Sequence, residues 1–148
     1  MSRILVQLVI NLIMTVIVIV LGTIIYKTSF SGIEYLLVAG VSLLGGIMFL
    51  AIGQAVVGLV RSATAVNAIG RILYVVLLLL GLLGSSGVLG DTIKSISDWT
   101  PVGAMISLFA SALGVAWGSA QTVAIIATAI YIVVGAFIGI RWFRWDSR

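Results

Sequence analysis

The chain has 148 residues, of which 62% are hydrophobic and only 8% are charged, and its mean hydropathy is +1.35. An ordinary soluble domain carries about a quarter charged residues and about half apolar ones. This composition excludes a soluble domain and predicts an all-α integral membrane protein. The length is sufficient for four or five membrane-spanning helices of about 20 residues each.

The residue types that are missing narrow the possible chemistry. The chain has no cysteine and no histidine, so it lacks thiolate nucleophiles and the commonest metal ligand and general base. We therefore expect no catalytic residue, no metal site and no cofactor in this chain, and we predict that it is not an enzyme. The net charge of +4 is expected to orient the chain in the bilayer and not to bind nucleic acid.

The first predicted span covers residues 4–25, which would extend about 33 Å as a helix and cross a hydrocarbon core of about 30 Å. A cleaved signal peptide is the alternative, because Arg3 precedes the apolar run. The run is longer than the apolar region of a signal peptide, and no small-x-small cleavage site precedes Tyr26. We therefore predict a retained helix. The second predicted span covers residues 35–60 and stops at Arg61.

The third predicted span covers residues 72–89. The preceding segment, 61–71, carries an arginine at each end, and we interpret it as an aqueous turn, although its alanines and valines permit a helix. After the third span, apolar residues recur about every three positions in 91–100, opposite charged and hydroxyl residues. This spacing predicts a short amphipathic segment on the outer membrane surface.

Residues 101–117 form an apolar stretch that Pro101 opens at a helix-start position. As a helix the stretch would measure about 25 Å, which is marginal for a span. The last predicted span covers residues 119–140 and is followed by Arg141 and Trp142, a pair typical of an interfacial anchor.

The distribution of basic residues decides the topology. With four spans, one side of the membrane holds every arginine (Arg3, Arg61, Arg71, Arg141, Arg144 and Arg148) and the other side holds both lysines (Lys27 and Lys94). The positive-inside rule then predicts cytoplasmic N- and C-termini. A fifth span would move the C-terminal arginines outside. We therefore predict that residues 101–117 form a re-entrant or half-membrane helical element, reached from the outer face and buried within an assembly.

The first span carries Gln7, Asn11 and Thr15 on one helical face, and the second span carries Gln54. Amides are poorly accommodated by lipid. These side chains are therefore candidates either for lining a substrate path or for interhelical hydrogen bonds, and the latter use is the more common. No predicted span contains an ionisable side chain, so the sequence offers no site for ion-coupled transport.

Small residues recur at four-residue spacing, a pattern that permits close helix packing. The candidates are Ser42 and Gly46 in the second span, Ala110, Gly114 and Gly118 in and just after the re-entrant element, and Gly135 and Gly139 in the last span.

The order of these features resembles the C-terminal part of a type-2 ABC exporter permease, the ABCG-like membrane subunit of drug and lipid exporters. The likeness is carried by LLGGIMFLAIGQAVVGLV at 43–60, by the break into Gly84, Ser85, Ser86 and Gly87 that ends the span within 65–90, by ISDWTPVGA at 96–104, and by FRWD at 143–146. A permease of this family has six spans, and its first two spans and its coupling helix have no counterpart here. We therefore expect either a fragment or a separately encoded half-permease that pairs with another membrane chain.

The resemblance implies a permease subunit of an ATP-driven exporter for an amphipathic or lipid-like substrate or drug. ATP and Mg²⁺ would be bound by a separate subunit, and Ser85 and Ser86 would belong to an outer gate. The alternative is a structural or accessory subunit of a larger membrane complex. A small lipid-metabolising enzyme is a third interpretation, disfavoured by the lack of histidine, cysteine and acids at membrane depth. The expected partners are another membrane chain, an ATP-binding subunit and the lipid bilayer, and the expected location is a bacterial cytoplasmic (inner) membrane.

Overall fold

The computed structural model describes residues 2–26, 30–60 and 62–142. These residues form helices and no strand, in the order α1 (Ser2–Tyr26), α2 (Gly32–Leu59), α3 (Ala63–Ser85), α4 (Asp91–Trp99), α5 (Pro101–Ala112) and α6 (Ser119–Trp142). Within the described residues, α1, α2, α3 and α6 are long and apolar enough to cross a membrane. The predictions of an all-helical multi-pass membrane protein and of four spanning-length helices are confirmed.

Side-chain caps begin α2 and α5. Ser31 and Glu34 form a capping box at the start of α2: the Glu34 N–H donates to Ser31 Oγ at 3.3 Å, and the Ser31 N–H donates to Glu34 Oε2 at 2.6 Å. At the start of α5, Pro101 occupies the first turn, and the Gly103 N–H donates to Thr100 Oγ1 at 3.1 Å. These caps satisfy backbone donors that low-dielectric surroundings would otherwise leave unpaired.

The closest helix pair is α2 with α6, and glycine makes its contact possible. A Cβ built on Gly135 would lie 2.7 Å from the carbonyl carbon of Ala51, and one on Gly139 would lie 3.1 Å from Gln54 Cβ. Two backbones can approach this closely only where one helix lacks side chains. Gly135 and Gly139, one helical turn apart, therefore both lie in the contact between α2 and α6.

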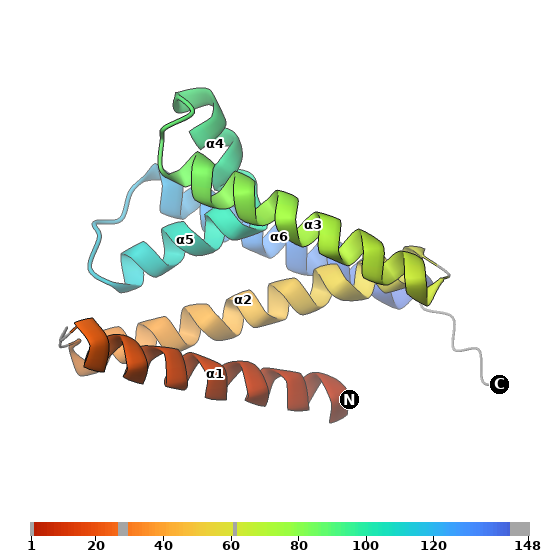
Figure 1. Ribbon diagram of the computed structural model, residues 1–148, viewed down its shortest axis with the longest axis horizontal. Coiled ribbons are helices and arrows are strands. Elements are labelled where there is room, and N and C mark those ends of the chain that lie inside the picture. Colours follow the sequence, from red (N-terminus) through yellow and green to blue (C-terminus); the bar gives the residue numbers. More distant parts are fainter. Residues whose placement is uncertain (1, 27–29, 61, 143–148) are drawn as a thin grey trace.

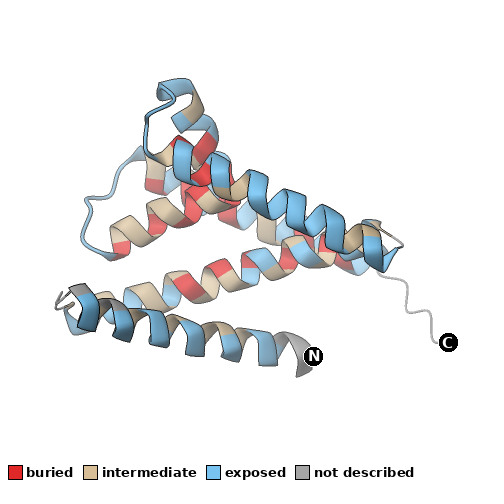
Figure 2. Cartoon of the chain, viewed as in Figure 1, coloured by how far each residue is buried: buried red, intermediate tan, exposed pale blue. Residues whose placement is uncertain are grey.

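The short helix α5 fills the space beside the α2–α6 pair. Its residues Ala104, Met105 and Leu108 are buried together with Met48 of α2 and Ala124 of α6. Figure 2 shows the buried residues concentrated in the centre of the bundle on α2, α5 and α6. The core is therefore assembled around a helix too short to cross a bilayer, since α5 measures about 18 Å.

Helices α4 and α5 meet at a buried bend, and we call the pair the α4–α5 V. A Cβ on Gly103 would lie 2.7 Å from the Ser97 carbonyl carbon, and one on Gly84 of α3 would lie 2.7 Å from Ser97 Oγ. Ser97 Oγ donates to the Gly81 carbonyl at 3.3 Å, and the Tyr131 hydroxyl donates to the Trp99 carbonyl at 3.0 Å. The bend of the V is thus held against α3 on one side and α6 on the other.

The helices run back and forth between two ends of the bundle (Figure 1). The beginning of α1, the end of α2, the start of α3 and the end of α6 lie together at one end, which we call the termini end. The end of α1, the start of α2, the start of α4 and the loop from α5 to α6 lie toward the other end, which we call the α4 end. Among the described elements α1 packs only against α2, and most of its described side chains are exposed.

The third helix differs in its bounds from the predicted span 72–89. It begins at Ala63, because the Ser62 side chain caps it by accepting from the Ala65 N–H at 3.5 Å. It ends at Ser85 and is followed by a turn in which Gly87 has a φ of 71°. The segment interpreted as an aqueous turn is therefore mostly helical. Arg71 lies inside a helix of spanning length, about 12 Å from its first residue, so the prediction that no span contains an ionisable group is wrong.

The element predicted at 101–117 is helical only over Pro101–Ala112. Gly114 has a φ of 92°, in the left-handed region that ends a helix. The predicted stripe of Ala110, Gly114 and Gly118 therefore does not form one helical face, since Gly114 and Gly118 lie in the loop before α6. The amphipathic segment predicted at 91–100 corresponds to α4.

We predict that Gly135→Ala lowers the stability of the fold. The added Cβ would overlap the backbone at Ala51, so α2 and α6 must separate, at a cost of about 1–3 kcal/mol. Thermal unfolding in detergent micelles measures the change. The matched control is Gly40→Ala, because a Cβ at Gly40 meets nothing within 4 Å and alanine favours a helix. Equal melting temperatures for the two variants would contradict the close α2–α6 contact.

Candidate functional site

Two of the polar side chains on the first helix bind the second helix. Asn11 Nδ2 donates to the Ser42 carbonyl at 3.0 Å, and the Thr15 and Ser42 hydroxyls are hydrogen-bonded to each other. Gly46 makes room for the amide, since a Cβ there would lie 3.3 Å from Asn11 Cγ. Asn11, Thr15, Ser42 and Gly46 thus form one interhelical contact, and its hydrogen bonds satisfy polar groups that lipid cannot.

An open groove of about 650 Å³ lies between α1, α2 and α3, and we call it the α1–α3 groove. Its walls are mainly apolar and come from three spanning-length helices and from the first turn of α5. The lining residues are Gln7, Phe49, Leu50, Ile52, Gly53, Gln54, Val56, Val57, Val66, Gly70, Leu73, Tyr74, Leu77 and Val102. Two of them, Gly53 and Gly70, have no neighbour within 4 Å of a built Cβ, so the missing side chains leave part of the groove empty.

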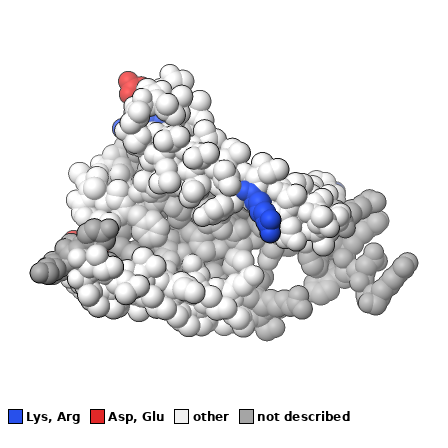
Figure 3. Space-filling view, viewed as in Figure 1, with Lys and Arg blue, Asp and Glu red and all other residues white. Residues whose placement is uncertain are grey.

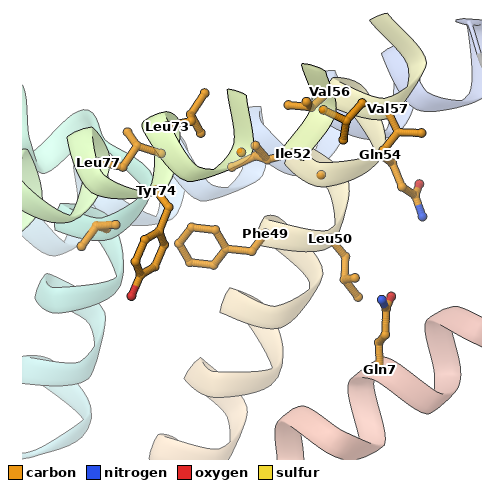
Figure 4. Close-up of a pocket in the computed structure, with 14 residues that line it drawn as sticks. Gln7, Phe49, Leu50, Ile52, Gln54, Val56, Val57, Leu73, Tyr74 and Leu77 are labelled. Atoms are coloured by element: carbon orange, nitrogen blue, oxygen red, sulfur yellow. The ribbon is translucent and has the colours of Figure 1, made fainter. Parts of the chain in front are cut away.

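The polar groups of the groove are two amides and a phenol. In Figure 4 the amide ends of Gln7 and Gln54 point toward one another, and the rings of Phe49 and Tyr74 lie side by side. Among the hydrogen bonds of the described residues, none involves the side chain of Gln7 or Gln54. The structure therefore brings together two amides that are far apart in sequence, at a position where a polar ligand group or water can bind them.

Both amides lie near the termini end of the bundle. Gln7 is about 7.5 Å from the first residue of α1, and Gln54 is about 7.5 Å from the last residue of α2. Arg71 follows the groove residue Gly70 directly and precedes Tyr74 by about one helical turn. Its side chain is exposed, and α3 contains no other lysine or arginine. Figure 3 shows that most of the visible described surface carries neither basic nor acidic side chains.

The described charges are divided between the two ends. Arg71 and Arg141 lie in the half toward the termini end, and the Arg141 guanidinium lies 5.9 Å from the centroid of the Phe137 ring. The described carboxylates (Glu34, Asp91 and Asp98) belong with Lys94 to elements at the α4 end. The side chain of Arg3 and all of Lys27, Arg61, Arg144 and Arg148 lie outside the described residues. In the described part, the α1–α3 groove is therefore next to positive charge only.

The serines expected at an outer gate make local bonds. Ser85 Oγ donates to the Leu82 carbonyl at 3.2 Å, and Ser86 Oγ donates to the Leu83 carbonyl at 2.7 Å. These bonds satisfy carbonyls at the C-terminal end of α3. Neither serine lines the α1–α3 groove.

A second, smaller groove of about 300 Å³ lies between the start of α2 and the end of α5, and Gly40 and Trp117 are among its residues. It has an almost entirely apolar lining. No group of histidine, cysteine, aspartate or glutamate side chains in the described ranges could hold a metal ion. The α1–α3 groove is thus the better candidate for binding an amphipathic molecule.

Sequence reasoning named Gln7 and Gln54 but not the other residues of this site. Tyr74, Gly53 and Gly70 were missed because their common position depends on how α1 and α3 lie across α2. Arg71 was placed in a turn, although Ser62 at a helix N-cap position followed by alanines was a signal for an earlier helix start.

Comparisons with protein-family models, with curated proteins and with solved structures give no match for this chain. No family assignment follows from them. The resemblance to exporter permeases therefore stays a prediction, and the capabilities of the site follow from its own residues and contacts.

We predict that Asn11→Ala destabilises the bundle by about 0.5–1 kcal/mol, the usual value of one interhelical hydrogen bond in a membrane. Titration with a denaturing detergent, followed by circular dichroism, measures the loss. Gln7→Ala is the matched control, because Gln7 occupies the same helical face one turn earlier and lines the groove without a described partner. Equal losses for both variants would show that Asn11 has no special role in α1–α2 packing.

Proposed function

We propose that this chain is a membrane permease subunit, or half-subunit, of an ATP-driven exporter for an amphipathic or lipid-like substrate. In this proposal a separate subunit binds and hydrolyses ATP. The observation that carries it is the α4–α5 V, an amphipathic helix and a proline-initiated short helix placed between two spanning-length helices. This is the order of elements on which the resemblance to type-2 exporter permeases depends.

The V is proposed to be re-entrant from the outer face, with both chain termini in the cytoplasm. The distribution of basic residues supports the cytoplasmic termini, and three features support a re-entrant element. Neither arm is long enough to cross a hydrocarbon core, Ser97 and Thr100 at the bend are buried, and Thr100 Oγ1 donates to the Ser97 carbonyl at 2.7 Å. Irregular backbone is stable at membrane depth only when it is buried and satisfied in this way.

The α1–α3 groove is the part of this chain suited to an amphipathic substrate. It combines a wide apolar wall with the amides of Gln7 and Gln54 toward the termini end, a division that matches a molecule with an apolar body and a polar end. Because α1 contacts only α2 among the described elements, a movement of α1 would change the width of the groove with little repacking elsewhere. An ATP-driven partner could use such a movement.

A structural or accessory subunit without a transport path is the second candidate. It is favoured by the contact of Asn11 and Thr15 with Ser42, because two of the three polar side chains on that face of α1 hold helices together. In this alternative, Gln7 and Gln54 would contact polar groups of a neighbouring membrane chain.

We predict that the tagged chain, purified from its native membrane in mild detergent, carries with it an ATPase that contains a glycine-rich phosphate-binding loop. Mass spectrometry identifies the partner, and phosphate release measures its activity. Replacement of the loop lysine of that ATPase by alanine should abolish phosphate release and leave the complex intact. Repeated purifications without an ATPase would remove the exporter proposal.

Leucine variants separate the two candidate functions within the same complex. For an exporter, Gln7→Leu and Gln54→Leu should reduce substrate efflux from reconstituted vesicles several-fold without changing the yield of complex. For an accessory subunit, the same variants should lower the yield of complex and leave efflux per assembled complex unchanged.

The proposed orientation predicts opposite labelling of the two ends. The natural chain has no cysteine, so single variants report one position each. Lys94→Cys should react with a membrane-impermeant maleimide in intact cells, whereas Arg144→Cys should react only after permeabilisation. Reaction of Arg144→Cys from outside would overturn the cytoplasmic C-terminus.

A further inference from the structure

We propose that the α1–α3 groove binds one anionic phospholipid, with an acyl chain against the apolar wall and the headgroup phosphate at Arg71. For binding, the inference depends only on the groove. For transport, it rests on the proposed exporter function and names the substrate class. The occupant is argued from the shape, the polarity and the charge of the groove.

The shape fits an acyl chain. The groove is an open trough along α2, with Phe49, Ile52 and Leu77 among its wall residues. Gly53 and Gly70 leave space where other residues would place side chains. In a bilayer such a space is filled by the nearest flexible apolar molecule, because empty volume forfeits dispersion contacts on both sides. In a bilayer, the acyl chain of a lipid meets this description.

The polarity places the headgroup. Gln7 and Gln54 lie toward the termini end of the groove, about 7.5 Å from helix ends. Helix α2 has 28 residues and is about 42 Å long, so a centred hydrocarbon core of about 30 Å would end about 6 Å from each helix end, at the level of the lipid glycerol and ester groups. Ester and phosphate oxygens accept hydrogen bonds from amide NH₂ groups. A purely apolar ligand has no oxygen that could accept these hydrogen bonds.

The charge selects an anionic lipid. Arg71 is exposed beside groove residues Gly70 and Tyr74, and all three described carboxylates belong to elements at the α4 end. Arg71 lies about 12 Å from the first residue of α3, and an arginine there extends its guanidinium toward the interface, where a phosphate can accept two parallel hydrogen bonds. A zwitterionic lipid brings its own cation beside its phosphate, so it gains less from this arginine.

Native mass spectrometry of the full chain in mild detergent tests the proposal. The probes are phosphatidylglycerol and phosphatidylcholine with identical acyl chains, added in equal amounts. We expect the wild-type chain to retain phosphatidylglycerol about tenfold more than phosphatidylcholine, as one charge-assisted contact predicts. Excess inorganic phosphate should displace neither lipid, because the acyl chain supplies part of the binding.

Two pairs of variants locate the site. Arg71→Gln should bring the preference for phosphatidylglycerol close to one, whereas the matched control Lys94→Gln, at the α4 end, should preserve it. Gly53→Leu should fill the groove and lower the retention of both lipids several-fold. Gly40→Leu is its control, because Gly40 lies on the same helix, has equally open space, and lines the other groove.

Folding of each variant is checked by its helical circular dichroism and its elution volume. If Gly53→Leu misfolds, Gly70→Leu fills the same groove from α3, where a built Cβ also meets nothing within 4 Å. Equal retention of the two lipids by the wild-type chain would overturn the proposal, and so would an unchanged preference in Arg71→Gln. Because this assay needs no ATPase, its failure would leave the exporter proposal standing, and loss of the ATPase would leave the lipid site standing.

Discussion

The close contact between α2 and α6 determines where every other helix lies. Gly135 and Gly139 let the backbone of α6 approach Ala51 and Gln54 of α2, and the pair presents a common apolar face to α5. Helix α5 packs Met105 and Leu108 against that face. Helix α3 packs mainly against the α4–α5 V, and α1 packs against α2. The positions of both outer helices therefore depend on the α2–α6 contact, although neither of them takes part in it.

The polar side chains of the described bundle fall into two sets, according to whether the chain itself supplies their hydrogen-bond partners. At the bend of the V and between α1 and α2, hydroxyls and amides are hydrogen-bonded within the chain, as lipid surroundings require. The amides of Gln7 and Gln54 have no described partner and face the α1–α3 groove. This difference is the physical basis for considering the groove, and not the Asn11–Ser42 contact, as the binding surface.

Much of the helical content could be predicted from the sequence, because a run of about 20 apolar residues has few structures available in lipid. The V could be anticipated in outline from Pro101 and from the amphipathic pattern before it. The bounds of α3 could not be predicted, because two signals conflict there. Ser62 and the alanines after it favour an early helix start, whereas Arg71 favours a turn. The end of α5 could not be predicted either. The four-residue spacing of Ala110, Gly114 and Gly118 matches the period of a helix, and the sequence does not show that Gly114 adopts a positive φ that ends the helix before it.

The groove itself was beyond sequence reasoning. Gln7 and Gln54 are on different helices, and their approach depends on how Asn11 docks beside Gly46. A residue pattern within one helix predicts which side chains share a face, but it carries no information about which face a neighbouring helix covers. For this reason Tyr74, Gly53 and Gly70 had no distinguishing signal before the helices were placed.

The pairing of α2 with α6 also has a consequence for how the protein is made. Ribosomes deliver helices in order, so α1 and α2 can form their antiparallel contact as soon as both have entered the membrane. The face of α2 that carries Met48 and Ala51 must then remain against lipid until α5 and α6 have been synthesised. Contacts between segments so distant in sequence form late and slowly. The newly inserted hairpin is therefore the stage at which this chain most needs protection from association with other helices in the membrane.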